Sequence, residues 1–226
     1  MRKFNFKKAI ATISAAVSLC STAVAMSPVT TNAATYGTRE KLVEVAEKYL
    51  NQKATYATFG YTSDWCASFA HKCVTEAGGK DYSSSASTTQ TLLDYRAKGK
   101  YHAKKTNSWS YSTRSCPSLT KDTNYTPKVG DLALIETNGK ISDGPDHTAI
   151  VVRVEGSGIN AIVYTIEGNT GGDENSYLPY YKTSTVTRDY WQNAVWGYCS
   201  PDYSNSSSGP INTEEISVVP YTKYLE

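Results

Sequence analysis

Apolar residues recur at helical spacing soon after the first polar segment of the chain. Within residues 37–53 they fall on one face of a helix, because they are three or four positions apart: Leu42, Val45, Ala46, Tyr49 and Leu50. Thr38 precedes them as a candidate N-cap. The spacing therefore predicts an amphipathic helix here.

A second segment repeats this spacing and ends at Gly78-Gly79, a pair typical of a helix end. Its apolar residues predict a short, largely buried helix: Cys66, Phe69, Ala70, Cys73, Val74 and Ala77. Residues 81–127 are rich in Ser, Thr, Lys and Tyr. We expect irregular structure there, with one or two helical turns around the stretch TTQTLLDYRAK.

Beyond Pro127 the period changes to that of strands. Four strands are predicted, over residues 130–136, 147–155, 160–167 and 193–199. Helices that come first and strands that follow indicate an α+β domain with an antiparallel sheet.

The first residues have the order of a secretory signal peptide. Four basic residues precede an apolar, alanine-rich run from Ala9 to Ala25. That run is Ser/Thr-rich and shorter than the ~20 residues of a membrane span. Residues 1–34 are therefore interpreted as a signal, cleaved after Ala25 or Ala33, residues 36–203 as one folded domain, and residues 204–226 as a Ser-rich linker with a short tail.

Removing the leader changes the charge of the chain. Residues 1–34 hold four of the 23 basic residues and no acidic one, which leaves 19 basic against 21 acidic residues, a net charge of −2. This balance indicates no polyanion partner, and nucleic acid in particular is not expected. No other stretch is apolar enough to cross a bilayer, so we expect an exported protein without a membrane span.

Four cysteines remain once Cys20 leaves with the signal: Cys66, Cys73, Cys116 and Cys199. On one helix, Cys66 and Cys73 would lie about 10.5 Å apart, whereas bridged cysteines have Cα atoms within ~7 Å. If Cys66 stays free for chemistry, at most one disulfide forms, and we expect Cys116 to pair with either Cys73 or Cys199.

Cys66 stands two residues after Asp64, a candidate N-cap, and so in the first turn of the predicted helix. A helix N-terminus and an imidazolium together lower a thiol pKa to roughly 3.5–7.5. The free N–H groups of such a turn also stabilise an oxyanion. A cysteine on an apolar stripe is more often a packing residue, which is our interpretation of Cys73; His71 and His102 are interpreted as surface residues.

The stretch GSGI separates strands 147–155 and 160–167 and is typical of a hairpin. A turn centred between Ser157 and Gly158 places His147 opposite residue 168, and a three-residue bulged loop places it opposite residue 167. Glu167 and Asn169 share a face of the strand. Either side chain is suited to fix the tautomer of an imidazole that acts as a general base.

Five segments in chain order carry a resemblance to a known family: DWCASFAHKC, PKVGDLALIE, PDHTAIVV, IEGNT and VWGYCSPDY. Over about residues 37–203 the chain resembles the CHAP domain, the cysteine- and histidine-dependent amidohydrolases and peptidases of bacterial cell walls. The resemblance implies a papain-like fold, with N-terminal helices packed on a C-terminal antiparallel sheet. It also implies Cys66 as nucleophile and His147 as base, with Glu167 and Asn169 completing the site.

Both candidate partners of His147 match the family, and the bulged loop favours Glu167 as the direct one, with Asn169 near the substrate or in support. Asp64, Trp65 and Thr148 flank the predicted catalytic residues and are expected to contact substrate. Thr148 stands where the family has a small residue and is expected to narrow the approach.

The resemblance implies a secreted, wall-associated peptidoglycan hydrolase, either an N-acetylmuramoyl-L-alanine amidase or a peptide endopeptidase. A non-catalytic wall-binding module of this fold and an acyltransferase using the same site remain alternatives. Some relatives bind calcium through aspartates before the cysteine, whereas the stretch ATFGYTSDW holds one acidic residue. We therefore expect no structural calcium and no other metal. We also expect no cofactor and a monomeric chain.

Overall fold

The computed structural model describes residues 37–172 and 176–204. The predicted signal at residues 1–34 and the tail beyond residue 204 lie outside these described residues, so both stay predictions. None of the described helices is long and apolar enough to cross a membrane.

The two predicted helices are present. The first, α1 (Arg39–Asn51), begins where expected, because the Thr38 side chain accepts a hydrogen bond from the N–H of Lys41 at 3.1 Å. The second, α3 (Cys66–Glu76), buries the predicted apolar face. The two apolar faces pack on each other and on the sheet.

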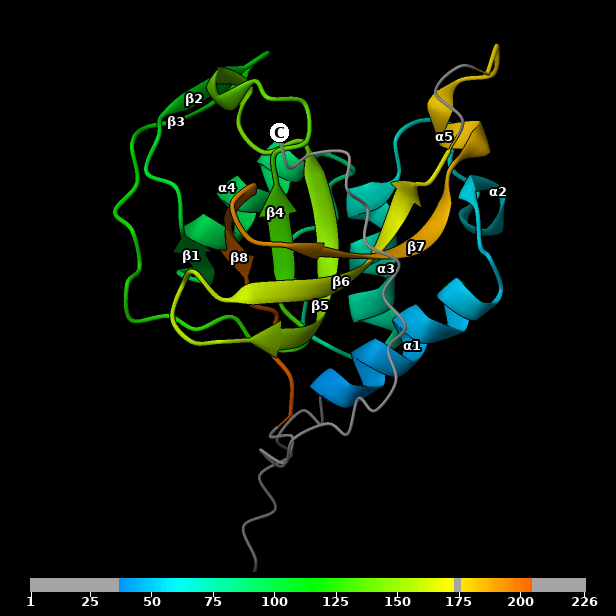
Figure 1. Ribbon diagram of the computed structural model, residues 1–226, viewed down its shortest axis with the longest axis horizontal. Coiled ribbons are helices and arrows are strands. Elements are labelled where there is room, and N and C mark those ends of the chain that lie inside the picture. The colour runs from blue at the N-terminus through cyan, green and yellow to red at the C-terminus, as the bar shows by residue number, and fades with distance from the viewer. Residues whose placement is uncertain (1–36, 173–175, 205–226) are drawn as a thin grey trace, which may run out of the picture. The chain divides into compact units, whose positions relative to one another are not determined.

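Six strands form one antiparallel sheet in the order β1-β8-β4-β5-β6-β7 (Figure 1). The strands of this sheet are β1 (Tyr101–Ala103), β4 (Leu132–Ile135), β5 (His147–Glu155), β6 (Ile162–Thr170), β7 (Thr185–Trp191) and β8 (Val195–Cys199). The remaining elements are short: α2 (Tyr56–Phe59), α4 (Thr88–Ala97), α5 (Tyr180–Thr183), the 3₁₀ turn η1 (Ile141–Asp143), and the ribbon of β2 (Trp109–Tyr111) and β3 (Arg114–Cys116).

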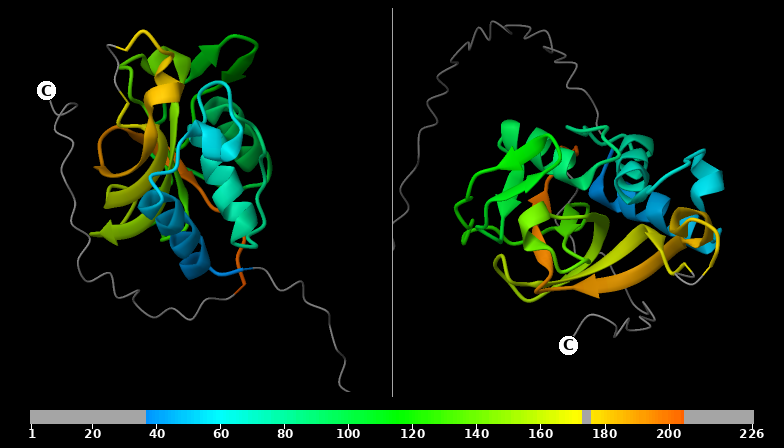
Figure 2. Two further views of the ribbon diagram at one scale, coloured as in Figure 1. Left: turned by 90° about the vertical axis from the view of Figure 1, so that its right-hand side faces the viewer. Right: turned by 90° about the horizontal axis from the view of Figure 1, so that it is seen from above.

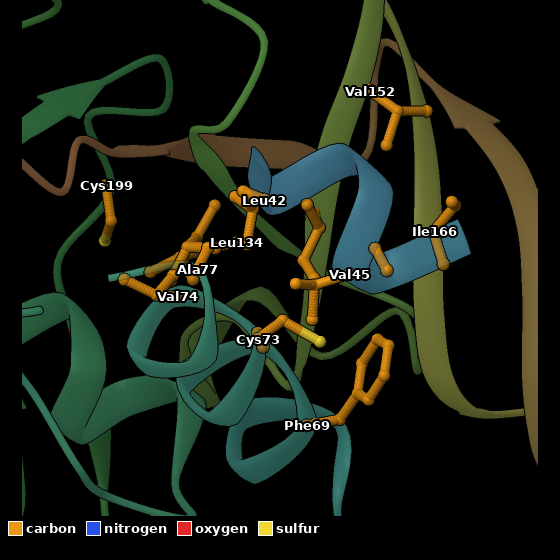
Figure 3. Packing of buried hydrophobic residues seen from close by; sticks show 14 of the residues in the cluster. Leu42, Val45, Phe69, Cys73, Val74, Ala77, Leu134, Val152, Ile166 and Cys199 are labelled. Carbon is orange, nitrogen blue, oxygen red and sulfur yellow. The ribbon is translucent and has the colours of Figure 1, made fainter. Parts of the chain in front are cut away.

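The helices lie to one side of the sheet (Figure 2). Helix α3 packs on β5 and β6, and α1 packs on α3 and β7. Figure 3 shows the cluster between them, to which α1 contributes Leu42 and Val45 and the sheet contributes Val152 and Ile166, with Cys73 of α3 in its midst. Burial of this apolar surface stabilises the contact that holds the start of α3 over the sheet.

The predicted α+β class is confirmed, with N-terminal helices on a C-terminal antiparallel sheet as in a papain-like domain. The strand predicted over 147–155 has those bounds in β5, whereas β6 runs to Thr170 and β8 starts only at Val195. The expectation of irregular structure over 81–127 was wrong in part, because α4 extends over ten residues and three short strands follow it.

The disulfide expectation was wrong. All four cysteines of the described residues are free and buried. Cys73 lies in the helix–sheet core, and Cys199 lies in β8. Cys116 accepts a hydrogen bond from Arg96 Nη1 at 3.2 Å instead of bonding to a second sulfur.

Asp131 is a fully buried carboxylate just before β4. It accepts hydrogen bonds from Arg39 Nη1 at 3.0 Å, the Tyr125 hydroxyl at 2.6 Å, Ser200 Oγ at 2.9 Å and the N–H of Lys128 at 2.7 Å. The group ties the start of α1 to the loop before β4 and to the end of β8. Asp131→Ala leaves the Arg39 charge without its partner, so we expect a loss of about 3–5 kcal/mol in unfolding free energy, measured by urea denaturation.

Glu44→Ala is the matched control for this change. Glu44 is exposed and pairs with Lys41 on the surface of α1 at 2.8 Å. Its removal is expected to cost less than about 1 kcal/mol. Equal losses in the two variants would show that the buried Asp131 group does not hold α1 to the sheet.

Candidate active site

Cys66 is the first residue of α3 and is almost fully buried. The N-cap is Trp65, which makes no side-chain cap hydrogen bond, so the prediction of Asp64 as N-cap was wrong. Trp65 fixes this end of the helix because its ring is fully buried and its Nε1 donates to Tyr181 O and Ser184 Oγ, both at 3.3 Å. Without a capping side chain, the first N–H groups of α3 remain available around the thiol.

Two threonine hydroxyls lie beside the sulfur. Thr88 Oγ1, at the start of α4, is 4.0 Å from Cys66 Sγ and 2.8 Å from Thr148 Oγ1. Both threonines are buried. Thr88 could not be singled out beforehand, because it belongs to a Ser/Thr-rich stretch without a chemical pattern.

His147 opens β5 and bonds to Glu167 of β6, with 2.8 Å between Nε2 and Oε2. The predicted contact is thus present, but the predicted register was wrong, since Glu167 pairs with Ala149. The register differs for two reasons. The loop between β5 and β6 is longer than the tight turn assumed in the prediction, and a bulge shifts the pairing between Val151 and Arg153. A diagonal neighbour stays within reach of a long side chain, which explains the contact in the shifted register.

The pKa values of Cys66 and His147 move in opposite directions. Burial raises the pKa of the Cys66 thiol, but the hydrogen bond and charge of His147, the N–H of Thr148 and the Thr88 hydroxyl lower it more. Burial lowers the pKa of His147, yet the Glu167 charge and bonding to Cys66 and Glu167 raise it well above its ordinary value. Because Glu167 occupies Nε2, Nδ1 is left for the thiol. The arrangement favours a thiolate beside an imidazolium.

Glu167 is fully buried, and its second oxygen is also bonded. Oε1 accepts hydrogen bonds from the Thr165 hydroxyl and the Trp191 indole N–H. Asp189 of β7 lies nearby; burial and the Glu167 charge raise its pKa to about 6. Thr165 was detectable in principle, since it shares a strand face with Glu167, whereas Trp191 lies in a strand that the sequence pattern did not reveal.

Among the described residues, Asn169 makes its side-chain hydrogen bonds to Asp64 and Ser184 and none to His147. Its Nδ2 donates to Asp64 Oδ1 at 3.3 Å, and its Oδ1 accepts from Ser184 Oγ at 2.9 Å. The backbone has φ 65°, the left-handed region that asparagine tolerates better than most residues. Asn169 thus joins the loop before α3 to the loop before β7.

Gly168 brings this strand close to the start of α3. A Cβ at this position would lie 2.5 Å from the Trp65 ring and 2.8 Å from Phe69. Glycine is therefore needed for the close approach that sets Glu167 beside the helix start.

Two predicted substrate contacts differ from what the structure shows. Trp65 and Thr148 are fully buried, so their side chains support the site from within and present no surface to a substrate. Asp64 is exposed at the entrance of α3. His71 was also interpreted wrongly: it is buried, with its ring nitrogens bonded to Asp81 Oδ2 at 2.7 Å and Thr91 Oγ1 at 2.9 Å.

His102, the other histidine interpreted as a surface residue, is half-buried and stacks on Tyr125, with ring centroids 3.4 Å apart. It also bonds to Asp122 Oδ2 at 2.8 Å. In the part of the chain that the structure describes, no group of three or more His, Cys, Asp or Glu side chains is placed to hold a metal ion.

One family model matches this chain. It is described as CHAP domain and covers residues 56–169, half of the chain, from α2 to Asn169. Cys66, His147 and Glu167 lie within the match, whereas Trp191 lies beyond it. No curated protein and no solved structure matches the chain.

Proposed function

The chain belongs to the CHAP domain family, and from this premise we propose that it is a secreted enzyme that cleaves an amide bond of peptidoglycan with Cys66 as its nucleophile. The family implies a peptidoglycan hydrolase of the amidase or peptidase type. Beyond the family's activity, we propose the catalytic residues, the order of the chemical steps and the secretion of the chain.

The observation that carries the proposal is the chain of contacts through Cys66, His147 and Glu167. The thiol has a lowered pKa beside an imidazole whose Nε2 is bonded to a buried carboxylate at 2.8 Å. A nucleophile, a base and a group that orients the base are the parts that covalent catalysis needs. A packing cysteine has the opposite character: in Cys73, burial raises the pKa far above its ordinary value.

The proposed reaction has two halves. In the first, the Cys66 thiolate attacks the carbonyl carbon of the amide, and backbone N–H groups at the start of α3 stabilise the oxyanion. The imidazolium of His147 gives its proton to the leaving nitrogen, and a thioester remains on Cys66. In the second, neutral His147 takes a proton from water, which attacks the thioester; the acid leaves, and the thiolate and imidazolium are restored.

The scissile bond is either the link between sugar and stem peptide or a bond within the stem or cross-bridge peptide. Mass analysis of fragments released from purified wall by the full mature chain separates these cases. Cleavage at the sugar link yields peptides with a free N-terminal alanine and glycans without peptide, whereas endopeptidase cleavage leaves part of the peptide on each glycan.

The same experiment separates the rival functions. Adding glycine amide as an acceptor would yield fragments that carry the added amine if the enzyme transfers acyl groups. Binding to insoluble wall without release of any fragment would contradict the proposed hydrolysis and favour a non-catalytic wall-binding module. Secretion is tested separately, by finding the chain outside the cell with its N-terminus at residue 26 or 34.

A further inference from the structure

The Glu167 carboxylate is bonded at both of its oxygens. Oε2 is 2.8 Å from His147 Nε2, while Oε1 accepts from Thr165 and Trp191. The carboxylate has no exposed surface. A buried carboxylate is costly unless donors satisfy it, so the two Oε1 donors stabilise Glu167 in its place beside His147.

Trp191 reaches Glu167 along the face of the sheet. In the pairing of β6 with β7, Val163 lies opposite Trp191, Thr165 opposite Asp189 and Glu167 opposite Thr187. Alternate residues of a strand share a face, so Val163, Thr165 and Glu167 point the same way. The indole of Trp191 therefore lies over this row with its N–H directed at the carboxylate, and it is almost fully buried.

We propose that Trp191 and Thr165 are positioning residues of the Cys66 site, whose N–H and O–H donors satisfy the buried Glu167 carboxylate and hold it directed at His147. The inference rests on the proposed function for the chemistry of Cys66. It extends the site to β7, outside the residues that the family model matches. Within the described residues neither side chain hydrogen-bonds to the Cys66 sulfur, so both act through Glu167 and His147.

Trp191→Phe removes the indole N–H and keeps an aromatic ring, and Thr165→Val removes the hydroxyl at equal volume. The loss of one hydrogen bond to a charged group lowers the equilibrium stability of that group in its site by about tenfold. Each substitution therefore makes the Glu167 carboxylate less stable beside His147. The imidazolium then stabilises the Cys66 thiolate less, so the pKa of the Cys66 thiol rises. The thiolate is protonated at a less acid pH, and the acid limb of thiol reactivity moves to higher pH. We expect a shift of about one pH unit in each variant.

The measurement is the rate of Cys66 alkylation by iodoacetamide between pH 4 and 9, which needs no wall substrate. Alkylation in both variants should be about tenfold slower near the acid limb and unchanged at the alkaline end of the range, where the thiolate is fully formed in the variants and in the unchanged chain. With wall as substrate, kcat should fall while KM stays. Thr165→Ser restores the hydroxyl and should restore the profile.

Trp196→Phe is the matched control. Trp196 is also fully buried, and within the described residues its Nε1 has no hydrogen-bond partner. The same substitution there changes core packing without removing a donor from Glu167, so its acid limb should stay in place. Melting temperatures of both variants show whether packing loss alone explains an effect.

Other titratable groups face Glu167, and their effects on the pH profile must be distinguished from the effect of Glu167. These are His147 on β5, Asp189 on β7 and, beyond the imidazole, Cys66 on α3. Asp189, with a pKa of about 6, gains its charge within the range of the assay. The Trp191→Phe shift should persist in an Asp189→Asn background if Glu167 carries it.

An unmoved acid limb in both Trp191→Phe and Thr165→Val would overturn the inference, as would an equal shift in Trp196→Phe. Failure of the proposed function looks different. In that case Cys66 would still be alkylated at acid pH, and Trp191→Phe would still shift this profile, but the enzyme would release no fragment from the wall.

Discussion

Cys66→Ala is expected to lower wall hydrolysis by on the order of 10⁶, the scale of losing a catalytic nucleophile. No other thiol of the described residues lies beside His147, so nothing replaces the lost sulfur. The fold should persist, because alanine suits the first turn of α3 and the bond between His147 and Glu167 remains. Release of soluble wall fragments and the melting temperature measure the two effects.

Cys73→Ala is the matched control on the same helix. Cys73 is fully buried in the helix–sheet core (Figure 3), and burial raises its pKa, so it is an unreactive packing residue. Its loss should cost about 1–2 kcal/mol of stability and leave hydrolysis intact. Full hydrolysis by Cys66→Ala, or its loss in a folded Cys73→Ala, would contradict the assignment of Cys66 as nucleophile.

The elements that position the site were predictable where periodicity is strong. The apolar stripe of α1 and that of α3 are long enough to show the helical period, and both are buried except for Leu50 of α1, which is partly buried. β5 is a nearly continuous apolar run with clear ends, and its bounds were predicted correctly. Strong local pattern and tertiary packing agree in these elements.

β7 was missed for the opposite reason. It is an edge strand, and most of its side chains are only half-buried, so polar residues such as Arg188 and Asp189 interrupt any apolar alternation. The sequence pattern therefore did not predict that Trp191 contributes to the site. Edge strands depend on the neighbour they pair with more than on their own sequence pattern.

The contact between His147 and Glu167 was predicted, although the register used to predict it was wrong. Bulges shift strand pairing by whole residues, and one lies within β5 after Val151. The bulge cannot be read from the alternation of apolar residues, because Val151 and Val152 are both buried. The Glu167 side chain is long enough to reach His147 from the diagonal position, so the predicted contact is present in spite of the shifted register.

The same limit applies to the buried polar groups. His71 looked like a surface residue because it lies off the apolar stripe of α3, yet Asp81 and Thr91 satisfy both of its ring nitrogens. A histidine is buried when partners from elsewhere in the chain meet it. Such partners come from the tertiary fold, which local sequence pattern does not specify.

Glu167→Gln is expected to reduce kcat by roughly 10²–10⁴, the contribution typical of general acid–base catalysis. The Glu167 charge raises the pKa of His147, which keeps the imidazolium protonated as pH rises. Glutamine keeps the size and loses the charge, so the pKa of His147 falls. The upper limb of the pH–rate profile, where the imidazolium loses its proton, should move to lower pH.

Asn169→Ala should be milder, with less than about tenfold loss of kcat, because Asn169 bonds to Asp64 and Ser184 and not to the imidazole. Alanine at φ 65° adds strain of about 1–2 kcal/mol. Asn169→Gly removes the side chain without that strain and separates the two effects. If Asn169→Gly were nearly inactive while Glu167→Gln kept its turnover, the amide would orient His147 during the reaction, and the papain-like Cys-His-Asn arrangement would describe this site better than the carboxylate contact.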